Sequence, residues 1–431
     1  MSATATAPAP QADVPQGPPV VAVRRSWRQP VVLWVMGLLA LLGFGLGSPA
    51  GTTSGFRLSV ESQLVQLPSV VVPTQLTALL LAVLGLGVAG VVTWLVATRR
   101  PVSTWWSVAF GVSFALAFLV WAIADNEISF VSLLQGSLFL ATPLVFGALG
   151  GVLCERAGVI NISIEGQLLA GAFASAVVAS LTGNLYVGLL AAPVAGLFFG
   201  WLLAVFAIRY LVDQIVLGVV LNVLVLGLTS FLYGQVLVNN ADAWNQPGRF
   251  SRIPIPGLVE IPVLGPVLFN QSIIVYLMYV AVVVLHVMLF RSRWGLRVRA
   301  VGEHPKAADT AGIDVNKVRY RNVLMGGAMA GLGGAFFTLG SVGAFGEEMT
   351  AGQGFIALAA LIFGRWSPVG ALVAALLFGF ALNLASILSI IGTPIPLEFL
   401  LMAPYLVTIF AVAGVVGKVR APAADGVPYR S

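Results

Sequence analysis

Twelve apolar segments constrain what this chain can fold into more than any other feature of its sequence. Hydrophobic residues occupy 59% of its 431 positions, and the mean hydropathy is +0.99. Both values are far above what a soluble domain needs to fill its core. Since a spanning helix needs about 20 mostly apolar residues, we predict an all-α polytopic transmembrane helical bundle with about 10 to 12 spans.

The twelve segments differ in how well they suit a membrane span. They cover roughly 30–48, 74–97, 105–124, 130–152, 166–182, 184–208, 214–237, 272–290, 322–343, 354–364, 367–389 and 399–417. The segment at 354–364 is too short to cross alone, and the region 152–167 is too polar to lie in lipid. Both features predict broken or re-entrant helices, which is how many transporters line their pathway.

The distribution of positive charge predicts the orientation, because cytoplasmic loops retain Lys and Arg. With an internal N-terminus and twelve crossings, all of the 22 Lys and Arg residues except Arg57, Arg249 and Arg252 fall inside. We therefore expect a multi-pass cell-membrane protein with both termini in the cytoplasm. The net charge of +6 follows from this asymmetry, so we expect contact with membrane lipids and none with nucleic acid.

Changes in composition along the chain predict four regions. Residues 1–29, rich in Ala and Pro, are expected to form a disordered cytoplasmic tail. Residues 30–129 carry few polar side chains and are expected to form peripheral helices, the first of them uncleaved. Residues 130–417, where Gly, Pro and amide residues interrupt the apolar runs, are the expected permease core. Residues 418–431 are expected to form a cytoplasmic C-terminal tail.

The loop at 291–321 holds eight of the 22 Lys and Arg residues and contains a predicted short helix. Pro305 suits a first helical position and Gly312 suits the residue after the end, so Pro305–Ala311 is expected to form about two turns. Isolated helices need roughly 12 to 15 residues to be even marginally stable. We therefore expect a partner to hold this one, against an exposed side formed by Lys306, Ala307, Ala308, Asp309 and Thr310.

Polar residues inside apolar sequence are the candidates for a translocation pathway. They are Asn161, Ser163, Glu165, Gln167 and Asn222. A structural interpretation stands beside this one: residues 161–167 have a buried role, and Asn222 hydrogen-bonds a neighbouring helix. Asp213 precedes a helix, so capping is favoured over a transport role for it. The small residues of Gly326–Gly340 predict close helix packing or pairing with a homologous chain.

The sequence contains no recognisable catalytic or metal-binding constellation. The closest match to a phosphate-binding loop, Gly414–Lys418, lacks the hydroxyl residue that would follow the lysine. No His, Cys or carboxylate cluster has metal-ligand spacing, and the single cysteine, Cys154, has no partner for an internal disulfide. We expect a protein that is not an enzyme and has no metal or cofactor of its own.

Four runs in the same order resemble the permease subunits of bacterial nucleoside ABC importers, within the ribose and simple-sugar permease family. They are GGVLCERAGVINISIEGQ from Gly150, VDQIVLGVVLNVLVLGLTSFLYG from Val212, AVGEHPKAADTAGI from Ala300 and TAGQGFIALAALIFGRWSP from Thr350. The resemblance covers about Phe130 to Val416. It implies import of nucleosides or related simple sugars, with Asn161, Glu165, Gln167 and Asn222 as our candidates for the pathway.

The resemblance also implies partners. These are cytoplasmic ATP-binding subunits that bind the ATP, a second related permease, and an extracellular substrate-binding lipoprotein. The short helix would be the coupling helix that docks on the ATPase, with matching residues Glu303, Pro305, Ala307, Ala308, Asp309, Gly312 and Ile313. His304 replaces the expected Asn, which weakens the predicted cap. The alternative is a self-sufficient ion-coupled secondary transporter using Glu165 or Asp213; nothing in the sequence favours a membrane enzyme or scaffold.

Overall fold

The computed structural model describes residues 27–59, 66–391, 398, 402 and 420–430. Within this part of the chain, ten helices are long and apolar enough to cross a membrane. Ten of the predicted segments correspond to these helices, which confirms the polytopic helical bundle. The segment predicted at 354–364 is a shorter helix, α14 (Gln353–Phe363). The twelfth segment, 399–417, and the predicted N-terminal tail fall almost wholly outside the described residues.

The N-terminal helices form a compact unit of their own. It consists of α1 (Arg28–Leu39) with a π-helical continuation to Leu46, most of α2 (Thr74–Ala97) and most of α3 (Thr104–Ala122). Its small core contains Leu33, Val92 and Phe110. Large apolar side chains elsewhere on these helices, such as Leu80 and Val112, are exposed, as suits a surface that faces lipid.

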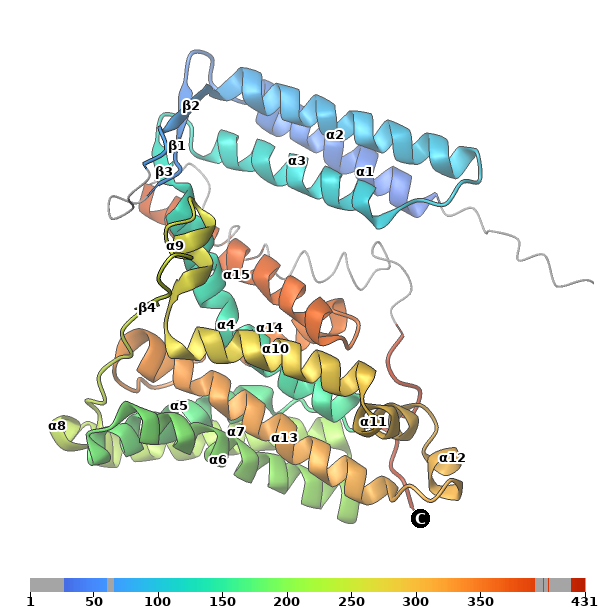
Figure 1. Ribbon diagram of the computed structural model, residues 1–431, viewed down its shortest axis with the longest axis vertical. Helices are drawn as coiled ribbons and strands as arrows, with labels where there is room; N and C mark the ends of the chain where they lie inside the picture. Colours follow the sequence, from blue (N-terminus) through green and yellow to red (C-terminus); the bar gives the residue numbers. More distant parts are fainter. Residues whose placement is uncertain (1–26, 60–65, 392–397, 399–401, 403–419, 431) are drawn as a thin grey trace, which may run out of the picture. The chain divides into compact units, whose positions relative to one another are not determined.

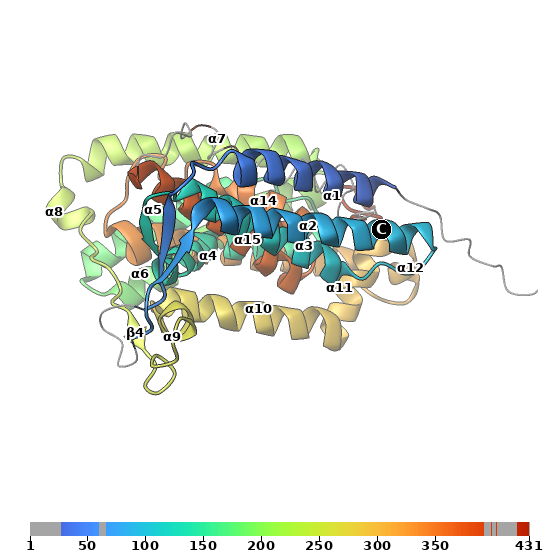
Figure 2. The same cartoon turned by 90° about the horizontal axis from the view of Figure 1, so that it is seen from above.

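The second unit begins with a small sheet and continues as a bundle (Figures 1 and 2). Strand β1 (Thr53–Arg57) pairs antiparallel with β2 (Val70–Pro73) and parallel with β3 (Glu127–Ser129). The bundle helices are α4 (Phe130–Glu155), α5 (Ile164–Thr182), α6 (Leu185–Ala204), α7 (Gln214–Leu232), α10 (Ile273–Arg291), α13 (Val315–Ala335), α14 and α15 (Pro368–Ile391). Helices α6, α7 and α13 continue as π-helical turns to Arg209, Leu237 and Val342.

Helix α13 is the centre of this bundle, because it packs against α4, α5 and α6. The small residues predicted to allow close approach do so within the chain. A Cβ atom added at Gly331 would overlap the carbonyl oxygen of Ala192 on α6, and one at Gly334 would overlap that of Leu168 on α5. The predicted tight packing at Gly326–Gly340 is therefore confirmed.

The connections gather at the two ends of the bundle (Figure 1). One end carries α8 (Ala241–Trp244), α9 (Leu264–Phe269) and the antiparallel pair β4 (Ile253–Pro254) and β5 (Asn270–Gln271). The other, which we call the α12 end, carries α11 (Arg293–Glu303), α12 (Pro305–Thr310) and residues 420–430. Neither the strands nor α11 was predicted, because short elements in loops leave no apolar periodicity.

Two helices begin inside the bundle. Helix α14 has 11 residues, which is roughly 16 Å at 1.5 Å per residue and about half of a 30 Å hydrocarbon core. It ends at the turn before α15, at the α12 end. Helix α5 restarts at Ile164 after an irregular segment, and its first turn contacts the beginning of α14. The structure thus confirms the prediction of discontinuous helices.

Candidate functional site

A closed ring of three polar side chains supports the irregular segment before α5. Ser163 Oγ donates to Asn161 Oδ1 (2.7 Å), Asn161 Nδ2 donates to Gln167 Oε1 (3.0 Å), and Gln167 Nε2 donates to Ser163 Oγ (3.0 Å). All three side chains are buried. Because irregular backbone at membrane depth must be surrounded by protein or line a cavity, this ring has a structural role. The candidates Asn161 and Gln167 therefore point into the protein.

Asn222 on α7 bonds the same broken region from the neighbouring helix. Its Oδ1 accepts from the backbone N–H of Gly166 (2.8 Å), and its Nδ2 donates to the carbonyl oxygen of Ile162 (2.9 Å). Two peptide groups that the interrupted helix leaves without helical partners are thereby satisfied. Asn222 thus bonds a neighbouring helix, as the structural interpretation predicted, and it also lines a pocket; its place in the pathway stays a prediction.

Glu165 fastens the first turn of α5 to the beginning of α14. Its Oε1 accepts from Thr350 Oγ1 (2.6 Å) and from the Gly352 N–H (2.8 Å), and its Oε2 accepts from the Gly354 N–H (2.5 Å). A carboxylate is favoured at this position because the N-terminus of a helix presents free N–H groups and the positive end of its dipole. Any side chain at Gly354 would overlap the backbone of Glu165, so the contact requires glycine there.

A pocket of about 330 Å³ lies between α5, α7 and the segment that leads into α14. Its polar lining consists of Glu165, Asn222, Glu348 and Thr350, and its apolar lining includes Phe355. Sites that bind small molecules usually have mostly apolar walls with a few polar groups among them. Of the four predicted pathway residues, Glu165 and Asn222 meet in this pocket, whereas Asn161 and Gln167 do not line it.

Sequence reasoning missed three lining residues, Glu348, Thr350 and Phe355. Glu348 and Thr350 lie in a compact turn where Glu348 and Ala351 have φ values of 52° and 45° and Gly352 has 79°, and Phe355 lies in the first turn of α14. The sequence run that begins at Thr350, the fourth of those that resemble the permease family, could have pointed to Thr350 and Phe355.

Asp213, the candidate of the ion-coupled alternative, caps α7: its Oδ1 accepts from the N–H groups of Ile215 and Val216, both at 2.9 Å.

The predicted short helix exists as α12, with Pro305 at its first position and Gly312 at φ 80° beyond its end. Lys306, Ala307, Asp309 and Thr310 are exposed as predicted. Ala308 is only 4% exposed, so its place on the exposed side was wrong. It packs against Val301, Val315 and Tyr429, because α11 and α13 lie close on either side of so short a helix.

The other coupling candidates are distributed around this helix. Glu303 and Gly312 are exposed, whereas Pro305 and Ile313 are partly buried. His304 caps α12 without a side-chain hydrogen bond, as expected from the replacement of Asn. The set thus presents a largely open surface at the end of the bundle.

Residues 420–430 hold α12 in place from within the chain. The phenol of Tyr429 donates to Asp309 Oδ2 (2.8 Å), and the N–H of Ala424 donates to the carbonyl oxygen of Gly302 (2.9 Å). Arg319, which is 2% exposed, donates from Nη1 to the carbonyl oxygen of Val427 (2.9 Å). The C-terminal segment therefore supplies contacts that the sequence analysis expected from a partner, and docking of a partner on this helix stays a prediction.

Buried charge accompanies this C-terminal contact. Burial raises the pKa of Asp425 to about 7, and its carboxyl lies close to that of Glu155 at the end of α4. Burial also lowers the pKa of Arg156. Arg156 Nε donates to the carbonyl oxygen of Trp366 (2.8 Å) and so joins the α4–α5 turn to the α14–α15 turn. The α12 end is thus one connected set of contacts.

A family model described as "Branched-chain amino acid transport system / permease component" matches residues 133–412. The chain belongs to this permease family. It is 43% identical over 310 residues to the guanosine ABC transporter permease protein NupQ of Bacillus subtilis, covering 69% of this chain and 96% of that one. It is 40% identical over 308 residues to the nucleoside ABC transporter permease protein NupC of Lactococcus lactis, covering 68% and 94%.

A second permease from each of these organisms also matches. NupP of Bacillus subtilis is 28% identical over 300 residues and NupB of Lactococcus lactis is 26% identical over 246 residues. No solved structure matches the chain. The chain is thus the permease subunit of an ABC importer, and such permease components are not themselves enzymes. Among the described residues, no group of three His, Cys, Asp or Glu side chains is placed to hold a metal ion.

Proposed function

We propose that this permease imports nucleosides, or related simple sugars, with a second related permease, separate ATP-binding subunits and an extracellular binding lipoprotein. One observation carries the proposal: the chain matches 96% of a guanosine permease at 43% identity. The paired matches, NupQ with NupP and NupC with NupB, support a heterodimer of permeases. The ATP would be bound by the partner subunits.

The α12 end is the proposed cytoplasmic face. Arg156 and Arg209 follow bundle helices at this end, Arg293–Arg321 forms its loop, and Arg365 lies in the α14–α15 turn. The bundle's opposite end carries Arg249 and Arg252 in the loop between α7 and α10. Retention of Lys and Arg in the cytoplasm supports this proposed orientation, in which both termini are inside.

The pocket around Glu165 and Asn222 is the proposed part of the pathway that this subunit contributes. The carboxylates of Glu165 and Glu348 are acceptors suited to ribose hydroxyl groups, and Phe355 offers an aromatic face to a base. Val219, Val223 and Phe355, which are 49%, 64% and 49% exposed, leave the pocket open on the α7 side. The second permease would complete this wall, with Asn161 and Gln167 supporting it from within.

Helix α12 is the proposed coupling helix. Ala307, Asp309 and Gly312 offer small exposed surfaces that allow an ATPase subunit to approach closely, with Glu303, Pro305 and Ile313 at the edges. Tyr429 and Arg319 fix the helix to α13 through the C-terminal segment. Because α13 contacts α4, α5 and α6, movement of α12 would be transmitted to the helices that line the pocket.

Substitution at two adjacent alanines tests the coupling role. Ala307→Glu places a charge on the exposed side of α12, so we expect loss of ATPase co-purification and of nucleoside uptake with unchanged thermal stability. Ala308→Glu buries a charge and should instead destabilise the permease. Ala421→Glu, at another exposed site on the same end, is the matched control. Unchanged assembly and uptake in Ala307→Glu would contradict docking at α12.

Energy dependence separates the importer from an ion-coupled carrier. Asp213 serves as a cap, and Glu165 accepts three hydrogen bonds. Asp213→Asn keeps the cap and removes the charge, so we expect uptake to be retained. Uptake in the native transporter should stop on ATP depletion and survive dissipation of the membrane potential. The reverse result would support the carrier.

A further inference from the structure

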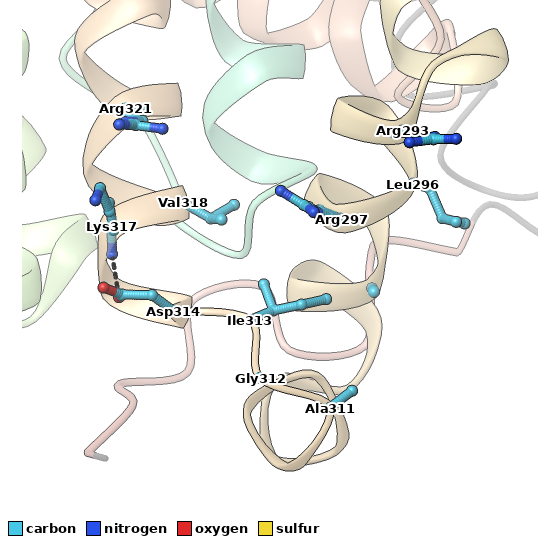
Figure 3. Close-up of a pocket in the computed structure, with 11 residues that line it drawn as sticks. Arg293, Leu296, Arg297, Ala311, Gly312, Ile313, Asp314, Lys317, Val318 and Arg321 are labelled. Carbon is cyan, nitrogen blue, oxygen red and sulfur yellow. Dashed lines mark hydrogen bonds between the residues drawn. The ribbon is translucent and has the colours of Figure 1, made fainter.

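A basic pocket of about 650 Å³ lies at the α12 end, between α11 and the first turns of α13. Figure 3 shows Arg297 projecting from α11 toward α13, where Val318 lies opposite it and Lys317 and Arg321 lie on the same part of the helix. Arg293, the first residue of α11, also lines the pocket. The pocket is separate from the candidate translocation pocket, which is lined by α5, α7 and the segment before α14.

The cations of this pocket have no partner within the described residues. Arg297, Lys317 and Arg321 are exposed, and none of their side chains forms an ion pair or a hydrogen bond there. The one acid in the lining, Asp314, accepts from the backbone N–H of Lys317 as the cap of α13. The lining therefore carries four cations, Arg293, Arg297, Lys317 and Arg321, against one carboxylate, and this net positive charge would stabilise an anionic occupant.

The position of the pocket places it at the level of lipid headgroups. Helix α13 with its π-helical continuation has 28 residues, roughly 42 Å at 1.5 Å per residue, against a hydrocarbon core of about 30 Å. Charged side chains avoid that core, so the turns with Lys317 and Arg321 lie at its edge. Arg293 is two residues beyond the end of α10 at Arg291. Leu296, 61% exposed, offers an apolar surface beside the cations.

We propose that this pocket binds the headgroup of an anionic phospholipid from the cytoplasmic leaflet, with Arg297, Lys317 and Arg321 contacting the phosphate and Leu296 contacting an acyl chain. Basic pockets between helices at this level are suited to such headgroups. A bound lipid would explain why an exposed leucine lies beside the cations and why the cations lie at the level of the headgroups. An acidic protein partner would explain only their positive charge. Bound lipid would bridge α11 and α13 and so steady α12, which lies between them in the chain.

The inference rests on the proposed cytoplasmic placement of this end, but its test does not require transport. The triple variant Arg297→Gln, Lys317→Gln and Arg321→Gln is compared with a charge-matched control, Arg291→Gln, Arg365→Gln and Arg420→Gln. The control residues are exposed and do not line the pocket. Native mass spectrometry of the purified full chain, titrated with phosphatidylglycerol and separately with phosphatidylcholine, counts retained lipids.

We expect the native chain and the control to retain phosphatidylglycerol in preference to phosphatidylcholine, and the triple variant to bind phosphatidylglycerol on the order of tenfold more weakly. Equal loss in the control and the triple variant would show a general charge effect and overturn the proposal. Full lipid retention in the triple variant with loss of ATPase co-purification would overturn it in favour of an acidic protein partner. Uptake assays test the transport proposal separately, so failure of one is distinguishable from failure of the other.

Discussion

Individual polar side chains in the bundle form hydrogen bonds inside the protein, and only some of them also line a pocket. Asn161, Gln167 and Asn222 are equally conspicuous in the sequence because each is polar amid apolar neighbours. In the structure their side chains have different surroundings. Asn161 and Gln167 hydrogen-bond each other inside the protein, whereas Asn222 bonds Gly166 and Ile162 and also lines the pocket. Polarity predicts that such a residue is buried with partners, but it does not predict which side of the helix those partners occupy.

Asn222→Ala should destabilise the permease, because it leaves the Gly166 N–H and the Ile162 carbonyl oxygen without partners. An unsatisfied buried group costs about 1–3 kcal/mol, so the melting temperature of the detergent-purified chain should fall clearly. The control is Asn239→Ala, whose exposed side chain bonds only the Gln235 carbonyl oxygen and should change stability by less than about 0.5 kcal/mol. Equal melting temperatures in both variants would contradict the bridging role.

At the scale of elements, α12 was predictable and its support was not. Pro305 and Gly312 mark the helix by their backbone conformations, which depend only on local chemistry. The contacts of Tyr429 and Arg319 join positions more than 100 residues apart, and residues 420–430 show no periodicity that would reveal them. Sequence reasoning therefore supplied an external partner for a helix that its own chain holds.

Removing one hydrogen bond tests this support. Tyr429→Phe deletes the bond to Asp309 and keeps the ring in its cluster, so we expect α12 to loosen by about 1 kcal/mol and uptake to fall. Hydrogen exchange at residues 305–311 should speed up about fivefold. Tyr210→Phe, at a tyrosine that is 61% exposed, is the control and should leave exchange there unchanged. Unaltered exchange in Tyr429→Phe would show that α12 is held by other contacts.

The contact of residues 420–430 should weaken as pH rises. The pKa of Asp425 is raised by burial from 3.8 to about 7, so the docked segment binds a proton more tightly than the free segment. Docking is then most stable below about pH 4 and loses this contribution as pH rises to about 7. Glu155 from α4 and Arg319 from α13 are the charged groups that face Asp425.

A spin label at the exposed position 427 measures this dependence. Its mobility should be higher at about pH 8 than at about pH 5.5, and Asp425→Asn should reduce the difference because it removes one titrating group. Identical spectra at the two pH values, or an unaltered difference in Asp425→Asn, would contradict titration at this site. Glu165→Gln, at a carboxylate that bonds Thr350, Gly352 and Gly354 and no residue of the segment, serves as the matched carboxylate-to-amide control.

For the whole molecule, hydropathy predicted most of the helices, because a bilayer requires about 20 apolar residues from every span. It did not predict how they pack, since the spanning helices are apolar on most sides. Helix packing could be predicted only along Gly326–Gly340, where the small size of the residues, and not their polarity, indicates a close contact. There the structure shows α13 contacting three helices at once, so the small residues mark the centre of the bundle.

One methyl group on this central helix should therefore disturb the whole bundle. Gly331→Ala places a Cβ against the carbonyl oxygen of Ala192 and beside Gly196, so α6 and α13 must separate, at an expected cost of about 1–3 kcal/mol. Gly227→Ala on α7 is the matched control, because its Cβ would meet nothing within 4 Å. The control should be neutral or stabilised by up to about 1 kcal/mol, since alanine favours a helix over glycine. We would measure thermal unfolding of both purified variants, and nucleoside uptake as a second test. Equal stability and uptake in Gly331→Ala and Gly227→Ala would show that the bundle does not depend on close packing around α13.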